Sequence, residues 1–221
     1  MKVSGRLNTR FFPKIAAAGS AVVLLGLGLA SPAQAEDVAL VAVDVIVDGT
    51  FSAPEAPEGS FATYGAGTRF GGLTGTAWVV TGGSIDHLSE AWNPPPAGTP
   101  EGTQSVDLNG TGPGTLAQSI GTVPAAKYTV SFAYKGNTDP GCFAGPAVKT
   151  ASLAFGGVQG PAAVQFAPQG SNVAWQNYSA TFTASGWASD LVLAGTNPSA
   201  CGMFVSDVKV TLVPVLTVSV P

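Results

Sequence analysis

Residues 127–134 read KYTVSFAY, and this stretch decides the fold class. Apolar and polar side chains alternate along it, so Tyr128, Val130, Phe132 and Tyr134 fall on one face of an extended chain. Alternation with a period of two residues is the signature of a β-strand that buries one face. Four large side chains on that face predict a strand that covers a hydrophobic core.

Similar runs recur along the chain between Gly- and Pro-rich segments. Residues 176–184 alternate in the same way. In 204–212 the alternation places Phe204, Ser206, Val208, Val210 and Leu212 on one face. Val38–Val47 is nearly all apolar, as expected for a strand buried on both faces. Further strands are expected at 77–80, 104–108, 115–120, 149–155, 163–166 and 190–193, with turns at 52–60, 64–72 and 93–100.

The composition points the same way. The 221 residues include 29 Gly and 17 Pro, and both residue types disfavour helix interiors. A chain that is 45% hydrophobic and only 10% charged is not a disordered polyelectrolyte. Many short strands with Gly-rich turns predict an all-β domain, a β-sandwich of the jelly-roll type.

Residues 1–35 have the order of a secretory signal peptide. A basic segment precedes an apolar run at 16–30, and Ala33-Gln34-Ala35 offers a cleavage site before Glu36. The run is short for a membrane span of about 20 residues, although an uncleaved anchor helix is the alternative. We expect a secreted, extracellular protein without a membrane-bound part after cleavage. Its segments are a signal peptide at 1–35, a lead-in at 36–43, a sandwich domain at 44–212 and a tail at 213–221.

Cleavage makes the chain more acidic. Four of the nine basic residues but none of the 13 acidic ones lie in 1–35, so the net charge changes from −4 to −8. Proteins bind phosphate backbones chiefly through Lys and Arg. Nucleic acid is therefore excluded as a partner, while the oligomeric state is left open.

The residues needed for common catalytic sites are scarce. His87 is the one histidine, and its neighbour Asp86 would point to the opposite face of a strand, where it cannot orient the imidazole. Two Cys and one His are too few for a structural zinc site. We expect no enzyme and no cofactor. A glycoside hydrolase using two of Asp86, Glu90, Glu101 and Asp107, or an esterase, is the third possibility.

The stretch 86–109 has the composition of a sugar-binding site. Sugar rings pack on aromatic faces, and carboxylate or amide groups bind their hydroxyls. Trp92 precedes a Pro run that keeps it out of a strand ladder, whereas Trp78 and Trp175 lie in strand patterns and are expected in the core. A buried polar network is the alternative role for Asp107 and Asn109. The candidate ligand-binding residues are Asp86, Trp92, Gln104, Asp107 and Asn109.

Several motifs resemble one family. They include VDGTF at 47–51, WVVTGGSID at 78–86, GTQSVDLNG at 102–110 and YTVSF at 128–132, with Cys201-Gly202 before the last strand. These resemble the choice-of-anchor C family, which is similar to plant cell-wall proteins of unknown-function family 642. The resemblance covers about residues 44–212. It implies a galactose-binding-like β-sandwich that is exported and associates with cell-wall polysaccharide without catalysis.

Two departures from the family pattern concern metal binding. Sandwiches of this type can hold calcium between their first and last strands, but Ser52 and Ser206 stand where relatives tend to have acidic residues. Too few oxygen ligands then remain for calcium, so we expect no metal site. The leading expectation is a secreted, non-catalytic protein that binds cell-wall or extracellular polysaccharide. The alternative is a structural or adhesive extracellular protein that binds other proteins.

Cys142 and Cys201 are the only cysteines, and we predict that they form a disulfide because an exported chain meets oxidising conditions. Free-thiol titration under denaturing, non-reducing conditions should find no thiol. Replacing both residues by Ala should lower the free energy of unfolding by about 4 kcal/mol, since the bridge closes a loop from residue 142 to residue 201. Two titratable thiols in the native protein would contradict the pairing.

Overall fold

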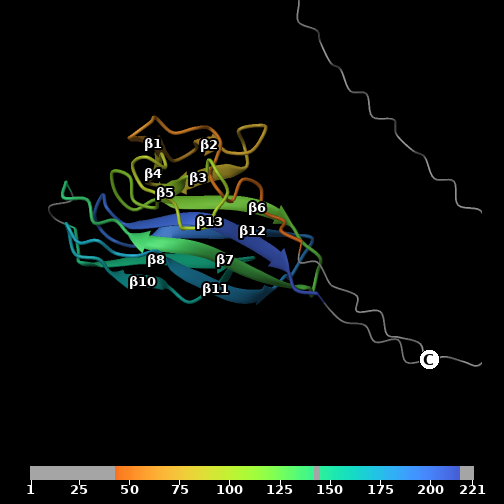
Figure 1. Cartoon of the computed structure of the whole chain (residues 1–221). Coiled ribbons are helices and arrows are strands. Elements are labelled where there is room, and N and C mark those ends of the chain that lie inside the picture. Colours follow the sequence, from red (N-terminus) through yellow and green to blue (C-terminus); the bar gives the residue numbers. More distant parts are fainter. Residues whose placement is uncertain (1–42, 142–144, 215–221) are drawn as a thin grey trace, which may run out of the picture. The chain divides into compact units, whose positions relative to one another are not determined.

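The computed structural model describes residues 43–141 and 145–214 (Figure 1). These residues form strands, turns and loops, and no helix. None of the described segments therefore qualifies as a membrane-spanning helix. The described strands are β1 Phe61–Gly65, β2 Arg69–Phe70, β3 Trp78–Gly82, β4 Ser84–Leu88, β5 Ser105–Asp107, β6 Thr115–Gly121, β7 Lys127–Gly136, β8 Val148–Phe155, β9 Val158–Gln159, β10 Ala163–Phe166, β11 Gln176–Thr183, β12 Ala188–Gly195 and β13 Met203–Leu212.

The strands form two antiparallel sheets. One has the order β1-β4-β5-β13-β7-β11, and the other has the order β10-β8-β12-β6-β3-β2, with β9 paired to β8. The chain changes sheet repeatedly, as at β5–β6, β6–β7 and β7–β8, which is typical of a jelly roll. Figure 1 shows β7 and β13 side by side, in agreement with their register. The predicted all-β sandwich is confirmed.

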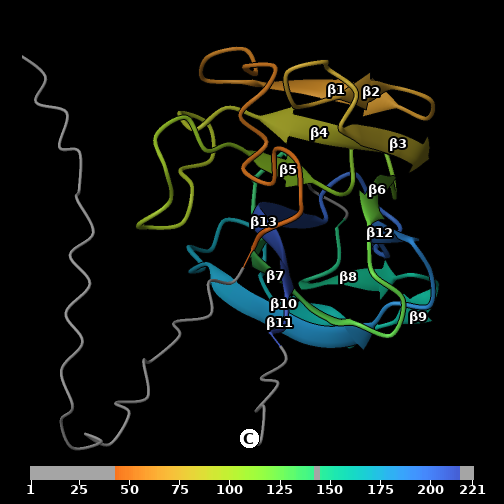
Figure 2. The ribbon, with the colours of Figure 1, turned by 90° about the vertical axis from the view of Figure 1, so that its right-hand side faces the viewer.

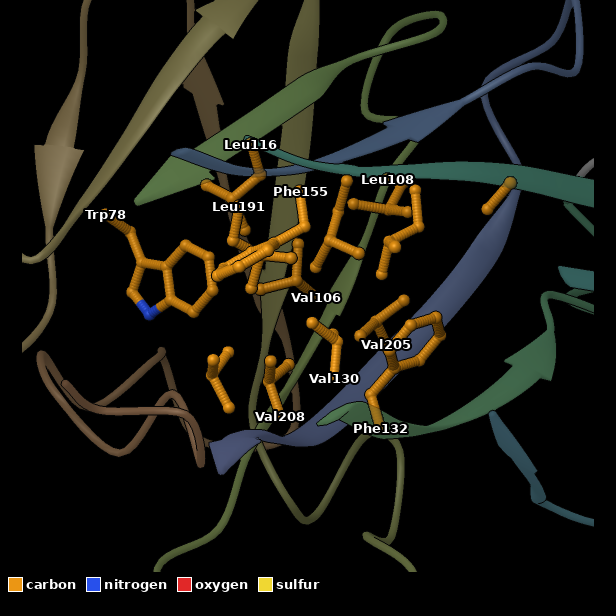
Figure 3. Packing of buried hydrophobic residues seen from close by; sticks show 14 of the residues in the cluster. Trp78, Val106, Leu108, Leu116, Val130, Phe132, Phe155, Leu191, Val205 and Val208 are labelled. Atoms are coloured by element: carbon orange, nitrogen blue, oxygen red, sulfur yellow. The ribbon is translucent and has the colours of Figure 1, made fainter. Parts of the chain in front are cut away.

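The core lies between the sheets. Tyr128, Val130 and Phe132 of β7 are buried there and Tyr134 packs against them, as the alternation in 127–134 predicts. Figure 3 shows the buried cluster reaching from Trp78 at one end to Phe132 at the other. Removing such side chains from water is the main force that holds two sheets together. The expected core position of Trp78 is confirmed.

The prediction that residues 204–212 present a single face is wrong. Val208 and Val210 are in the core, but so are Met203 and Val205. The register of β13 against β7 shifts between Ser206 and Lys209, and Asp207 has a φ of 50°. This β-bulge inserts a residue and exchanges the inward and outward positions along the strand. Phe204 and Ser206 therefore belong to the outer face.

Two other expectations need correction. The expected strand Val38–Val47 lies partly outside the described residues, and its described end forms a single bridge between Asp44 and Thr211. Val43 and Val47 are exposed there, so this end is not buried on both faces. The expected turn at 64–72 contains the end of β1 and all of β2, because two short strands with few alternating residues give no periodic signal.

Asn109, just after β5, fastens the connection between β12 and β13. Its side-chain amide nitrogen donates to the carbonyl oxygens of Asn197 (2.8 Å) and Ser199 (2.7 Å). A Cβ at either Gly195 or Gly202 would collide with Asn109 Oδ1. Three chain segments therefore meet closely at this point, and only glycine fits at the two contact positions.

We predict that Gly202→Ala lowers the free energy of unfolding by about 1–3 kcal/mol, because the new methyl group must displace the buried Asn109 side chain. Gly112→Ala is the matched control, since a Cβ at Gly112 would meet no atom within 4 Å. Denaturant unfolding of both variants measures the difference. Equal losses of stability would contradict the proposed packing.

Candidate functional site

A row of side chains crosses the outer face of the six-stranded sheet. The strand registers pair Thr63 with Asp86, Asp86 with Asp107, Asp107 with Phe204, and Phe204 with Lys135. Directly paired residues point to the same side of a sheet. The five positions therefore form one line across β1, β4, β5, β13 and β7, about 19 Å long at the usual strand spacing.

The burial of His87 confirms that the row lies on the outer face of the sheet. His87, next to Asp86, points inward and is fully buried. Its Nε2 donates to the carbonyl oxygen of Phe51 (2.9 Å), and its ring lies near those of Tyr64 and Phe70. Burial lowers the pKa of the His87 imidazole, against the effect of that hydrogen bond. The neutral histidine belongs to the core, on the opposite side of the sheet from Asp86.

The connection between β4 and β5 lies against this outer face; Figure 2 shows it in yellow-green, projecting beside the strands. Asn93 Nδ2 donates to Ser105 Oγ (2.8 Å) on β5. Trp175 Nε1, just before β11, donates to the carbonyl oxygen of Pro94 (3.0 Å). These two bonds tie the loop to β5 and to the segment before β11, and thereby hold Trp92 in place.

Two hollows lie along the row. The first has a volume of about 330 Å³ and includes Phe61, Thr63, Asp86 and Asp107 in its lining; we call it the acidic hollow. The second has a volume of about 320 Å³ and includes Pro94, Thr138, Phe204 and Lys135; we call it the lysine hollow. Trp92, Asn137 and Asp139 line both. The two hollows therefore adjoin, and we call them together the groove.

Trp92 stands at the junction of the two hollows. Its side chain is 42% exposed, and its ring meets that of Phe61 edge-on at a centroid distance of 5.8 Å. Phe61 is itself exposed. Two aromatic rings therefore stay exposed to water in the groove instead of being buried in the core.

The floor of the acidic hollow is a pair of carboxylates. Asp107 is 1% exposed, and it accepts hydrogen bonds from Asn137 Nδ2 (2.7 Å), the Asn109 amide (2.9 Å) and the Gly202 amide (3.1 Å). Burial raises the pKa of Asp107 to about 7, which these bonds oppose and the nearby charge of Asp86 reinforces. Burial also raises the pKa of the Asp86 carboxyl, against a hydrogen bond from Thr63.

A buried lysine from the other sheet reaches the same place. Lys149 of β8 donates from Nζ to the carbonyl oxygen of Cys201 (2.7 Å). The amide of the same peptide unit, at Gly202, donates to Asp107. Burial lowers the pKa of the Lys149 ammonium, while the charge of Asp107 acts in the opposite direction. One peptide unit thus lies between a cation and an anion.

The other end of the groove is aromatic and basic. Lys135 Nζ lies 5.0 Å from the centre of the Trp175 ring and 5.7 Å from that of Phe204. The expectation that Trp175 is in the core is wrong, because the ring is only half-buried and covers Lys135. Position 175 precedes β11, so its place in an alternating run did not determine its burial.

The predicted site residues separate into two groups. Asp86, Trp92 and Asp107 line the groove. Asn109 is buried and makes the hydrogen bonds described above, which agrees with its alternative role in a buried polar network. Gln104 lines a different hollow and braces the loop before β1, because its Oε1 accepts from the Ala56 amide and its Nε2 donates to the Phe51 carbonyl oxygen.

Several groove residues are not predictable from their place in the sequence. Phe61, Thr63, Lys135 and Asn137 come from segments far from 86–109. Phe61 is the first residue of β1, and only the register of β1 against β4, which the sequence does not contain, brings it to Trp92.

The serines at the two departures from the family pattern bond within the protein. Ser52 Oγ donates to Asp48 Oδ1 (2.9 Å), and Ser206 Oγ donates to the carbonyl oxygen of Gln104 (2.8 Å). Within 43–141 and 145–214, no group of three or more His, Cys, Asp or Glu side chains is arranged to hold a metal. Cys142 lies outside the described residues, so its pairing with Cys201 stays a prediction.

Comparisons with known proteins found one matching family and several solved structures to which the chain is distantly similar. The profile of a family described as a protein of unknown function, DUF642, matches residues 44–211. No curated protein matches the chain. A family 35 carbohydrate-binding module from Clostridium thermocellum is 13% identical, with 77% of this chain and 98% of that chain covered and a TM-score of 0.41. A family 35 module from Paenibacillus barcinonensis is 15% identical, with 70% and 99% covered and a TM-score of 0.39.

Asp107 makes stability depend on pH. Its pKa is about 7 in the folded protein against an ordinary 3.8, so its contribution to stability is lost as pH rises between these values. We predict that the Tm of Asp107→Asn, relative to the native protein, rises as pH increases from about 4 to about 8.

Thermal unfolding followed by circular dichroism measures this difference, and Asp190→Asn on the surface is the control for loss of a charge. The lowered pKa of His87 has the opposite effect on stability, because it reduces the free energy of unfolding as the pH falls below 6.5. That effect is common to both proteins and cancels in the comparison. A Tm difference that is constant with pH would show that Asp107 does not titrate in this range.

Proposed function

The chain belongs to the DUF642 family, and from that premise we propose that it is a secreted, non-catalytic protein that binds cell-wall or extracellular polysaccharide in the groove. We place it, within this group, with proteins of the choice-of-anchor C type. The observation that carries the proposal is Trp92, a fixed and exposed ring beside a row of carboxylate and amide groups.

The groove combines the two kinds of group that a sugar needs. The rings of Trp92 and Phe61 offer apolar surface for the C–H face of a pyranose. Asp86, Thr63 and Asn137 line the same hollow and can bind hydroxyl groups. Because the loop bonds of Asn93 and Pro94 hold Trp92 in place, little conformational entropy is lost on binding.

The length of the row supports binding of a polymer. It extends about 19 Å across five strands, and the two hollows adjoin along it. Several linked sugar units fit over such a distance, whereas a single monosaccharide would occupy only one hollow. We infer that the groove takes a stretch of a chain.

A glycoside hydrolase is the second candidate, because Asp86 and Asp107 are paired across β4 and β5 and the pKa of Asp107 is about 7. A carboxyl group that is protonated near neutral pH beside a second carboxylate is the arrangement of an acid–base pair. However, Asp107 accepts hydrogen bonds on both oxygens and is 1% exposed, which favours a role in shaping the floor of the hollow.

A protein-binding role is favoured by a different surface. Val148, Val164 and Phe166 are exposed beside one another on β8 and β10, at an edge of the seven-stranded sheet. Exposed apolar side chains in a group are typical of protein contacts. This surface is separate from the groove residues, so the two roles can be tested independently.

We predict that Trp92→Ala weakens retention on an immobilised glycan at least tenfold, or about 1.4 kcal/mol, with little change in Tm. The ring provides apolar contact to the sugar but is only half-buried in the protein. A glycan array with the protein lacking residues 1–35 selects the glycan, and affinity electrophoresis compares the variants. Trp187→Ala is the control, because Trp187 is 77% exposed on the β11–β12 turn, outside the groove.

Unfolding of Trp92→Ala would show that the ring is structural and that the ligand binds elsewhere. If Trp92→Ala changes neither glycan binding nor stability, the protein-binding role is favoured over glycan binding. Release of reducing sugar from the bound glycan, abolished by Asp107→Asn, would favour the hydrolase.

A further inference from the structure

We propose that the lysine hollow binds a negatively charged substituent of the sugar chain, either the carboxylate of a uronic acid or a sulfate ester, through Lys135. This inference rests on the proposed function, since it assigns a ligand class to one end of the same groove. The shared chemistry is one negative charge on a sugar ring, placed beside an ammonium group that has two aromatic neighbours.

Lys135 differs from the other buried or paired lysines of the described chain. Lys209 pairs with Asp207 (2.6 Å), which is the one ion pair among the described residues. Lys149 is buried and donates to the Cys201 carbonyl oxygen. Lys135 instead has the rings of Trp175 and Phe204 around it, and its side chain borders a hollow of about 320 Å³.

Among residues 43–141 and 145–214, the Lys135 ammonium has aromatic contacts and no hydrogen-bond acceptor. An ammonium group has three donors, and a ring face attracts its charge without accepting a conventional hydrogen bond. Burial lowers the pKa of Lys135, so part of its hydration is already lost. A carboxylate or sulfate oxygen in the hollow would supply both an acceptor and a countercharge.

The surroundings of Lys135 fix its position. Trp175 is tied to the β4–β5 loop through Pro94, and Phe204 is the residue opposite Lys135 in the adjacent strand. The ammonium is therefore held at one end of the row instead of moving freely on the surface. A positioned charge recognises an anion with less loss of side-chain entropy than a flexible lysine.

The neighbouring charges limit what the hollow accepts. Asp139 also borders it, with Oδ1 occupied by the Gly141 amide (2.6 Å), and Asp107 lies two strands away at a distance of about 10 Å. One ammonium among several carboxylates suits a singly charged sugar better than a densely charged polymer. A chain with an anionic unit in the lysine hollow would place a neutral unit over Asp86 and Asp107.

Matched polymers that differ only in charge test the proposal. Polygalacturonate is compared with its methyl ester, and a sulfated galactan with its desulfated form, by affinity electrophoresis of the native protein. We expect at least tenfold stronger retention by the charged member of one pair, and the pair that shows it identifies the anion. Equal retention by both members of each pair would overturn the proposal.

Substitution of Lys135 links the preference to this hollow. Lys135→Met keeps the apolar stem and removes the charge, so it should abolish the preference while retaining the affinity for the uncharged polymer. Lys135→Arg should keep the preference, and therefore remains informative if Lys135→Met fails to fold. Lys127→Met, at the exposed start of the same strand, is the control. It should change neither the preference for the charged polymer nor the affinity for the uncharged one.

The outcomes separate this proposal from the proposed function. A charge preference that survives Lys135→Met in a folded protein would overturn the inference alone. Retention of only uncharged glycans, weakened by Trp92→Ala, would overturn the inference and leave glycan binding in place. If no glycan on the array is retained by the native protein, the proposed function fails, and the inference fails with it.

Discussion

The groove depends on one peptide unit, the bond between Cys201 and Gly202. Its carbonyl oxygen accepts a hydrogen bond from Lys149 of one sheet, and its amide donates to Asp107 of the other sheet. A bond to a charged group is stronger than one between neutral groups, and here two such bonds act on one unit. The backbone of Gly202 also lies against Asn109, where no side chain fits. This polar contact joins the sheets where the hydrophobic core ends, and it sets the floor of the acidic hollow.

The strand pattern could be predicted from the sequence because the core imposes it. Residues 127–134 alternate regularly, and they form β7, which extends two residues further. The same reasoning failed at Asp207, because Phe204 continues the alternation of Val208 and Val210 in the sequence, and the positive φ of the bulge residue cannot be read from a hydrophobic pattern. It also failed at Val43 and Val47, whose apolar character suggested burial that the described end of this segment does not have.

The site was less predictable than the fold. Trp92 and its acidic neighbours could be proposed because they are close in sequence and lie next to a Pro run. Lys135, Asn137 and Phe61 are brought to them only by the pairing of β1 with β4 and of β7 with β13. Strand register depends on contacts between distant segments, and a single sequence does not contain it. For the same reason Gln104 and Asn109 were grouped with the ligand-binding residues, although both serve to fasten loops.

The bulge in β13 has a consequence for how this chain tolerates insertions and deletions. On either side of Asp207 the strand follows opposite inside–outside patterns, so that Val205 and Val208 both face the core although three positions separate them. Substituting Asp207 changes one side chain, but deleting it would bring the two halves into a single phase. Met203, Val205, Val208 and Val210 would then all lie on one face of a regular strand, so a deletion at Asp207 preserves the core face of β13. Loss of Lys209 would instead put Val208 and Val210 on opposite faces, so the bulge is the place where β13 can lose a residue without exposing its core side chains.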